Sequence, residues 1–225
     1  YDNLYAIVGV HPHHADKPLD GCHPELVSGS PEGWIKQLER LAKHKKVVAI
    51  GEIGMDYFRY QSNGITDPKT QKEIFEAQIE LAHKLKLPLQ IHNRQAGKDI
   101  LEILLHHKNE LMNPPGMFHC FSGSINFLKK VLDLGFYVGF DGNITYKGLA
   151  PGEDTALSDL VKAAPLERIL VETDSPFLTP QPHRKERNVP KYVIITGKEI
   201  ARLKGISFDA VREKTTQNAS AIFQL

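Results

Sequence analysis

The stretch Val47-Val48-Ala49-Ile50-Gly51-Glu52-Ile53-Gly54-Met55-Asp56-Tyr57 decides the fold of this chain. Its β-branched apolar residues are typical of a strand that is buried on both faces, as in parallel sheets. The same stretch carries a carboxylate, Glu52, between two glycines that let a backbone or a ligand approach closely. A buried carboxylate costs free energy unless a metal ion or a basic partner compensates its charge. The alternative is that Glu52 caps the following helix.

Composition limits the class of protein. The chain has 225 residues, of which 24% are charged and 41% hydrophobic, and this suits one globular domain over residues 1–225. The formal net charge of +1 gives no overall basic field, so any binding of nucleic acid must be local. No apolar run approaches the ~18 residues of a membrane span, and no signal peptide is visible. We therefore expect a cytoplasmic protein without a membrane partner.

Two segments depart from a regular pattern. The chain begins at Tyr1 rather than at a methionine and is almost at once in strand-like sequence. We therefore expect it to be N-terminally incomplete. Residues 16–33 are rich in Pro, Gly and Ser and have no clear period, which predicts a long loop insertion.

Six segments have the character of buried strands, and most are followed by helical spacing. The expected strands are residues 5–10, 47–57, 87–92, 117–121, 136–140 and 168–174. The expected helices are residues 34–42, 70–86, 100–111, 124–134 and 154–164, with two or three more after residue 190. This alternation predicts a parallel α/β fold. No Gly-rich phosphate fingerprint follows a strand, and polar residues end many strands, so a (β/α)8 TIM barrel is favoured over an open doubly wound sheet.

Candidate metal ligands stand at the ends of four predicted strands. They are Glu52, His92, His119 and Asp174. Imidazole and carboxylate together suit Zn, Mn, Fe or Mg rather than a soft thiolate site. The two-residue period of a strand predicts that Cys120 points away from the face that carries His119. Cys120 is therefore expected to be a small core residue and not a ligand.

Two further groups could serve a substrate. The His11-Pro12-His13 segment could chelate a metal, or its imidazoles could bind substrate or neighbouring residues. The basic segment His183-Arg184-Lys185-Glu186-Arg187-Asn188 follows Asp174 and would overhang the mouth of a barrel. Such a charged run is often only a solvated surface, but beside a metal site it could hold a phosphate.

Five short motifs in order resemble one known family. They are Gly9-Val10-His11-Pro12-His13, the stretch from Gly51 to Tyr57, Ile91-His92-Asn93-Arg94, His119-Cys120-Phe121-Ser122-Gly123 and Glu172-Thr173-Asp174-Ser175-Pro176. Together they resemble the TatD family of metal-dependent deoxyribonucleases, which belongs to the amidohydrolase-like TIM barrels. The resemblance covers essentially the whole chain.

The resemblance implies a (β/α)8 barrel that binds two divalent metal ions (Zn, Mg or Mn) and hydrolyses phosphodiester bonds of DNA. It also implies that Glu52 bridges the two metals, that His92 and His119 complete one site, and that Asp174 serves the other. The family's opening Asp-x-His-x-His strand has no counterpart in this chain. We therefore expect the first two strand–helix units to be absent and one metal site to be incomplete, with fewer than two ions bound.

The resemblance also implies roles for the remaining residues. Asp174 would orient or deprotonate the attacking water, with Glu52 as the other catalytic residue. The candidate phosphate-binding residues are His11, His13, Arg94, Arg184, Lys185 and Asn188. The expected partner is DNA or another phosphoester, bound by a monomer. Two alternatives remain: the same barrel and metals hydrolysing a small-molecule amide, ester or lactone, and an inactive truncated remnant.

Overall fold

The computed structural model describes residues 3–16, 31–58 and 66–225. These divide into two compact units, Tyr1–Met117 and Phe118–Leu225, and each unit is described by itself. One domain over residues 1–225 therefore stays a prediction. Of the loop predicted at residues 16–33, positions 17–30 lie outside the described residues. The predicted loop extends too far, because helix α2 already begins at Pro31, and proline suits a first helical position.

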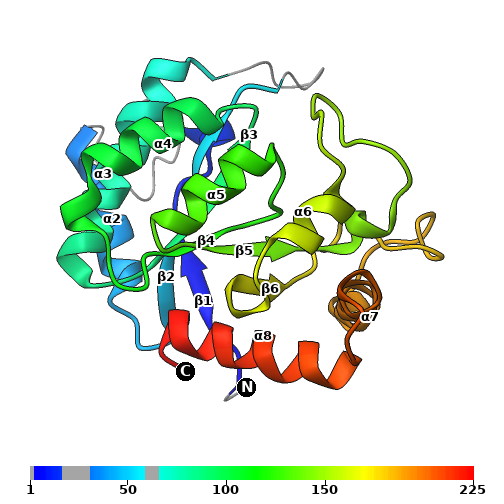
Figure 1. The fold of residues 1–225 in the computed structure, drawn as a ribbon. Helices are drawn as coiled ribbons and strands as arrows, with labels where there is room; N and C mark the ends of the chain where they lie inside the picture. Colours follow the sequence, from blue (N-terminus) through cyan, green and yellow to red (C-terminus); the bar gives the residue numbers. More distant parts are fainter. Residues whose placement is uncertain (1–2, 17–30, 59–65) are drawn as a thin grey trace. The chain divides into compact units, whose positions relative to one another are not determined.

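The first unit is a parallel sheet covered by helices (Figure 1). Its strands are β1 (Ala6–Val8), β2 (Val47–Asp56) and β3 (Leu89–Arg94), and its helices are α2 (Pro31–Ala42), α3 (Pro68–Leu85) and α4 (Gly97–His106), with the 3-10 helices η1 (Pro12–His14) and η2 (Lys108–Glu110). Strand β2 pairs in parallel with β1 and with β3. The apolar residues Ile50, Ile53 and Ile91 are fully buried, as expected for a strand covered on both faces.

Glu52 lies at an irregularity of β2. Ile50 pairs with Leu89 and Ile53 with Ile91, so Gly51 and Glu52 together face a single residue of β3. Such a bulge re-aims a side chain within a strand. A methyl group at Gly51 would lie 2.6 Å from the Cβ of the facing Gln90. The glycine before Glu52 therefore allows the close approach of β3.

Helix α3 holds the ends of two strands through buried glutamines. The Gln71 amide accepts a hydrogen bond from the Asp56 backbone N–H (2.8 Å) and donates one to the Asp56 carbonyl (3.0 Å). Two turns later the Gln78 amide does the same to Val10 (2.6 and 3.2 Å). Both glutamines are at most 1% exposed, and their satisfied amides fix the loops that leave β1 and β2.

The second unit has a similar strand–helix alternation. The strand β4 (Gly116–Phe118) ends where this unit begins, and the strands within the unit are β5 (Tyr137–Phe140) and β6 (Ile169–Val171). Its α-helices are α5 (Ile125–Asp133), α6 (Leu157–Ala163), α7 (Val193–Lys204) and α8 (Phe208–Phe223). Its 3-10 helices are η3 (Gly142–Thr145), η4 (Leu166–Arg168) and η5 (Pro190–Tyr192). Strands β5 and β6 pair in parallel. Phe118 makes edge-to-face contacts with Phe121, Phe127 and Phe136 at centroid distances of 5.3–6.2 Å, the favoured geometry for aromatic pairs.

The predicted ends of two strands are wrong. Strand β4 ends at Phe118, and β6 ends at Val171. Cys120 adopts a left-handed backbone conformation, with φ of 45°. The two-residue alternation of a strand therefore does not apply at His119 and Cys120, and Cys120 is half-buried rather than a core residue. The parallel α/β pattern itself is confirmed, since the described residues contain all six predicted strands.

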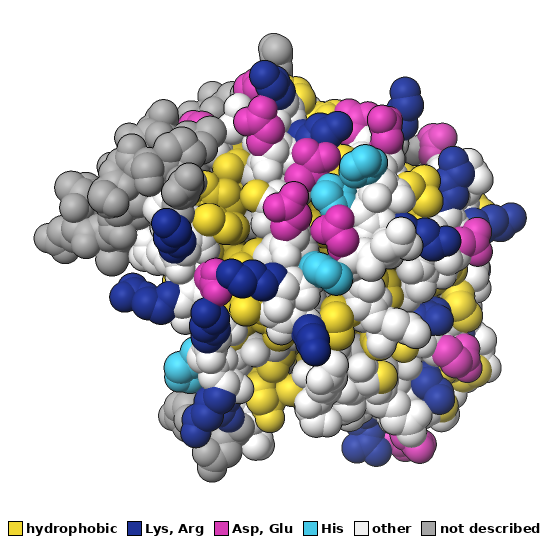
Figure 2. All heavy atoms as spheres, turned by 90° about the vertical axis from the view of Figure 1, so that its left-hand side faces the viewer, with side chains coloured by type: hydrophobic (Ala, Val, Ile, Leu, Met, Phe, Trp, Pro, Cys, Tyr) yellow, Lys and Arg dark blue, Asp and Glu magenta, His cyan; other side chains and the backbone are white. Residues whose placement is uncertain are grey.

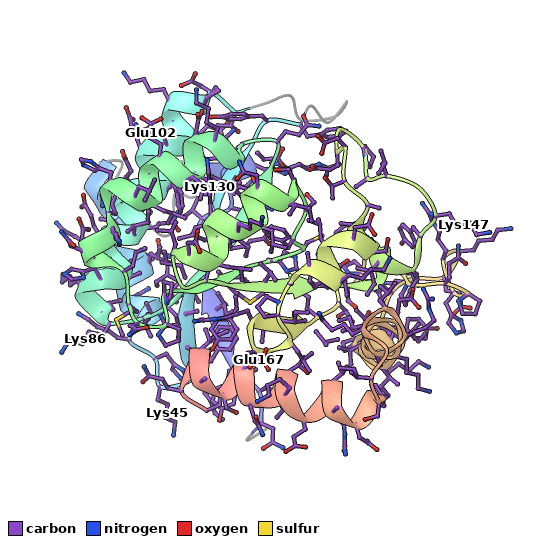
Figure 3. The ribbon with its side chains drawn as sticks, in the orientation of Figure 1. Lys45, Lys86, Glu102, Lys130, Lys147 and Glu167 are labelled. Carbon is purple, nitrogen blue, oxygen red and sulfur yellow. The ribbon has the colours of Figure 1, made fainter. Side chains whose placement is uncertain are left out.

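Two lysines illustrate the exposed ends of helices and loops in the first unit. Lys86 ends α3 with φ of 57°, and its side chain extends away from the ribbon, as does that of Lys45 (Figure 3). Among the described helices, none combines the length and the apolarity that crossing a bilayer requires.

Replacing Glu39 with Gln is expected to weaken the contact between α2 and α3. The Glu39 carboxylate lies 2.7 Å from Lys43 Nζ and 2.8 Å from Lys84 Nζ of α3. Hydrogen bonds from the two lysines lower the pKa of Glu39 to about 2. The stabilisation is therefore present above the unfolded pKa near 4.5 and is lost as the pH falls through about 2. Thermal melts followed by Trp34 fluorescence should show a small loss at pH 7 that shrinks in high salt. An equal loss at every pH and salt concentration would contradict this role.

Candidate metal centre

In the first unit, His92 of β3 lies between two carboxylates of β2. Its Nδ1 is 2.7 Å from Glu52 Oε1, and its Nε2 is 2.9 Å from Asp56 Oδ2. The register places His92 opposite Gly54, midway between the two acids. Because alternate residues of a strand share a face, Glu52 and Asp56 both reach the same imidazole.

Two histidines from the η1 segment complete this cluster. His13 Nε2 lies 2.7 Å from Asp56 Oδ2, and His11 Nε2 lies 3.8 Å from Glu52 Oε1. The His11 ring packs edge-on against both His13 and His92 at centroid distances of 4.5 Å. The ligand atoms of His11, Glu52 and His92 lie within 4.8 Å of one another, as do those of His13, Asp56 and His92.

The electrostatics of the cluster follow from this geometry. Burial tends to lower the pKa of His92, but hydrogen bonds to Asp56 and Glu52 raise it above its ordinary value. Burial tends to raise the pKa of Asp56, but hydrogen bonds from His92 and His13 and the charge of His92 together lower that pKa below its ordinary value. Burial and the neighbouring His92 lower the pKa of His11 to about 4. These shifts favour the protonated form of His92 between its two carboxylate neighbours and the neutral form of His11.

In the second unit, His119 has a similar pair of carboxylate neighbours. Its Nδ1 lies 2.7 Å from Glu172 Oε2, and its Nε2 lies 3.5 Å from Asp174 Oδ1. The other Glu172 oxygen accepts a hydrogen bond from the Cys120 backbone N–H at 2.6 Å. Glu172 thus fixes both the ring and the turn that carries it. The Asp174 side chain is 35% exposed and is open to solvent.

Asp141 lies next to this second cluster. It directly follows β5 and is fully buried. Burial and the negative charge of Glu172 raise the pKa of Asp141 to about 7. Burial and the charge of Asp141 raise the pKa of the Cys120 thiol well above its ordinary value. The negative charge of Glu172 therefore disfavours ionisation of both Asp141 and Cys120.

The sequence-predicted residues fall into these two clusters. Glu52 and His92 lie in the first unit, and His119 and Asp174 lie in the second. The ligand set that combines Glu52, His92 and His119 therefore stays a prediction.

The predicted phosphate-binding residues have different surroundings. The half-buried Arg94 guanidinium lies 3.9 Å from the centre of the Phe58 ring. Arg184 is exposed and lies 3.8 Å from the centre of the Tyr146 ring, and the adjacent Lys185 is also exposed. Asn188 is 2% exposed, and its amide donates to the Phe177 carbonyl. This contact gives Asn188 a structural role in the loop.

Three residues of the clusters were not predicted from the sequence. They are Asp56, Asp141 and Glu172. Asp56 and Glu172 stand in the quoted motifs, two or four residues from a predicted ligand. Asp141 directly follows a predicted strand, so the signal that selected His92 would also have selected it.

The donors fit a divalent cation. Neutral imidazole and carboxylate oxygens are the usual ligands of zinc in catalytic sites, where three protein ligands leave an open position. Carboxylates contact both ring nitrogens of His92 and the Nδ1 of His119, and a carboxylate on one ring nitrogen orients the ring and raises the basicity of the other. A cation would replace a proton on His92, so binding should weaken as the pH falls.

Known proteins resemble the whole chain. The family model for TatD related DNase matches residues 1–224. The chain belongs to the TatD family of metal-dependent hydrolases. This TatD-family chain is 39% identical over 226 residues to a Bacillus subtilis (strain 168) protein named uncharacterized metal-dependent hydrolase YabD, across 100% of this chain and 79% of the relative. It is 34% identical over 224 residues to the Escherichia coli (strain K12) protein named uncharacterized metal-dependent hydrolase YcfH, across 100% of this chain and 75% of the relative.

A solved structure agrees with the family. The TatD homologue YJJV from Escherichia coli K12 superposes with a TM-score of 0.82 and 26% identity, and the match covers 100% of this chain and 78% of that one. The predicted fold class is thereby confirmed as the TIM barrel of the TatD family, of which the described residues contain six strands.

Replacing Asp56 with Asn is expected to weaken metal binding by this TatD-family chain roughly 10- to 100-fold, the usual cost of losing a residue that orients a metal ligand. The amide keeps the shape of Asp56 but removes the charge that holds His13 and His92. Isothermal titration with Zn²⁺ measures the change. Asp67→Asn, at the exposed start of α3, is the control that should not alter affinity. Unchanged affinity in Asp56→Asn would exclude Asp56 from the metal centre.

Proposed function

We propose that this TatD-family hydrolase cleaves phosphodiester bonds of DNA. The observation that carries the proposal is that each unit presents an imidazole bracketed by two carboxylates, His92 in the first and His119 in the second. The family's description as a DNase supports DNA as the substrate. The proposed metal ligands are Glu52, His92, His119 and Asp174. The proposed ions are Zn, Mg or Mn, with fewer than two ions bound by this chain.

Individual basic side chains, rather than the net charge of +1, support binding of a nucleic acid. Figure 2 shows Lys and Arg side chains interspersed with acidic ones over the face in view, without a uniformly basic area. Arg184 and Arg94 each stack on an aromatic ring, which pre-orients the guanidinium for a phosphate. Aromatic rings of this kind also offer surfaces on which bases stack. Arg184 and Lys185 are the exposed pair proposed to hold backbone phosphates.

Individual residues have distinct roles in the proposed hydrolysis. When bound, a divalent cation supplies charge neutralisation at the phosphate and a water of lowered pKa. Asp174 is the solvent-accessible carboxylate that accepts one proton from the attacking water. As the new P–O bond forms, the ester P–O bond breaks and the leaving alkoxide takes a proton from solvent. His11 stays neutral because its pKa is about 4, so it can hold the substrate without repelling the cation.

The proposal is tested with an end-labelled single-stranded DNA, the matching RNA and p-nitrophenyl acetate. Each is incubated with the chain and Mg²⁺, Mn²⁺ or Zn²⁺, and with a chelator. We expect metal-dependent cleavage of DNA that the chelator stops. Hydrolysis of the small ester without cleavage of DNA would replace the proposed substrate with a small molecule. No cleavage of either nucleic acid with any of the three metals would overturn the proposal.

Replacing Arg184 with Ala is expected to weaken DNA binding and to lower the salt dependence of binding by about one released counterion. The reason is that the guanidinium is exposed and held against Tyr146. Fluorescence anisotropy with labelled DNA between low and high salt measures both quantities. Lys147→Ala, at an exposed lysine labelled in Figure 3, is the matched control. Equal salt slopes for Arg184→Ala and the parent chain would exclude a phosphate contact.

A further inference from the structure

Three side chains of the second unit each stand directly after a strand. His119 follows β4, Asp141 follows β5 and Glu172 follows β6. Strands β5 and β6 are parallel, and the Glu172 backbone N–H donates to the carbonyl of Phe140, the residue before Asp141. Because parallel strands end at the same edge, these residues converge. One ligand atom of each lies within 4.8 Å of the other two.

Asp141 has an unsatisfied oxygen inside this cluster. Its side chain is 0% exposed, the Cys120 thiol hydrogen-bonds to its carboxyl group, and Oδ1 accepts a long hydrogen bond of 3.3 Å from the Asn143 backbone N–H. Oδ2 is buried and has no hydrogen-bond partner among the described residues. A buried carboxylate oxygen without a donor costs free energy, and the nearby negative charge of Glu172 increases that cost. A positive charge placed between the two acids would remove it.

The neighbouring groups supply the rest of a coordination environment. Glu172 Oε2 lies 2.7 Å from His119 Nδ1, so carboxylate and imidazole already meet on the Nδ1 side of the ring. The Cys120 thiol borders the same space and accepts a hydrogen bond from the Asn143 amide at 3.5 Å. Asp174 lies on the other side of the ring, 3.5 Å from Nε2. The Nδ1 side is therefore a separate position from the one that Asp174 serves.

We propose that Asp141, Glu172 and Nδ1 of His119 form a binding site for a divalent transition-metal ion such as Zn²⁺. Two carboxylates and one imidazole are a usual three-residue zinc set, with a fourth position left for water. The ion replaces the proton on Nδ1, which leaves to solvent. This site lies entirely within the second unit, and it does not depend on the proposed hydrolysis of DNA.

The test uses the full chain with His92→Gln, because His92 belongs to both candidate ligand groups of the first unit. Zn²⁺ affinity is measured by isothermal titration, and thermal melts are recorded with and without Zn²⁺. We expect Asp141→Asn in this background to weaken Zn²⁺ binding by roughly 100-fold or more. Replacing a residue that only orients a metal ligand already lowers metal affinity by about 10–100-fold. We also expect its metal-free melting midpoint to rise, because the amide removes a buried negative charge that lies beside Glu172.

Matched controls separate this site from the Nε2 side. The exposed Asp159→Asn and Glu167→Gln, the latter labelled in Figure 3, should leave Zn²⁺ affinity unchanged. Glu172→Gln should reduce it as Asp141→Asn does. Zn²⁺ affinity that is unchanged in Asp141→Asn but lost in Asp174→Asn would overturn the inference and leave the proposed function standing. If the parent chain does not cleave DNA but Asp141→Asn still weakens Zn²⁺ binding, the proposed function is overturned and this inference stands.

Discussion

Glu52→Gln is expected to reduce metal-dependent hydrolysis by about 1,000-fold or more while the chain stays folded. Glu52 Oε1 contacts His92 Nδ1 at 2.7 Å, and His11 lies 3.8 Å from the same oxygen. The amide preserves the shape of the side chain but removes the negative charge that balances a cation. Losing a residue that only orients a ligand costs ~10–100-fold, so losing a proposed ligand should cost more.

The measurement is the initial rate of DNA cleavage, together with the metal content of the purified variant. Glu80→Gln, on the exposed face of α3, is the control for an identical chemical change away from the cluster. Circular dichroism should show the same spectrum for both variants. Turnover close to that of the parent chain, with metal still bound to Glu52→Gln, would remove Glu52 from the mechanism.

Gly54→Ala is expected to cost about 4 kcal/mol or more of stability, which is exceptional for a single methyl group. Gly54 has φ of 136°, a conformation that residues with a side chain rarely adopt. A methyl group there would overlap the carbonyl oxygen of His92 on the neighbouring strand. Relief of the overlap requires β2 and β3 to separate, and this would also move His92 away from Glu52 and Asp56.

Denaturant unfolding followed by Trp34 fluorescence and by circular dichroism measures the loss. Gly148→Ala is the control, because Gly148 also has a positive φ (88°) but no atom lies within 4 Å of an added methyl. It should lose only about 1 kcal/mol from backbone strain. If the two variants lose equal stability, the close approach of β2 and β3 at Gly54 is not what the glycine provides.

The period and composition of the sequence determined the strands and helices of this chain. All six strands were predicted near their observed positions, because each is a short apolar run of the kind that a parallel sheet buries. Helix α3 was placed within two residues at its start and one at its end. These patterns are local: each depends only on residues that are close together in the sequence and not on a partner strand.

Motif residues were also visible in the sequence. Glu52, His92, His119 and Asp174 each stand in or just after such a run, and an acid or imidazole there is costly without a compensating charge. The five motifs that contain these residues resemble the TatD family of metal-dependent hydrolases, and the family match agrees.

Only the tertiary structure decided which side chains meet. The bulge at Gly51 and Glu52 changes the pairing of β2 with β3, so counting residues from Ile50 would misplace every later side chain. The left-handed backbone of Cys120 breaks the two-residue alternation from which a core position for Cys120 is predicted. Asp56 beside His92, and Asp141 beside Glu172, bring together residues 31–36 positions apart in the chain. Such contacts depend on strand register and on turns that no single stretch of sequence encodes, because their energy comes from partners far along the chain.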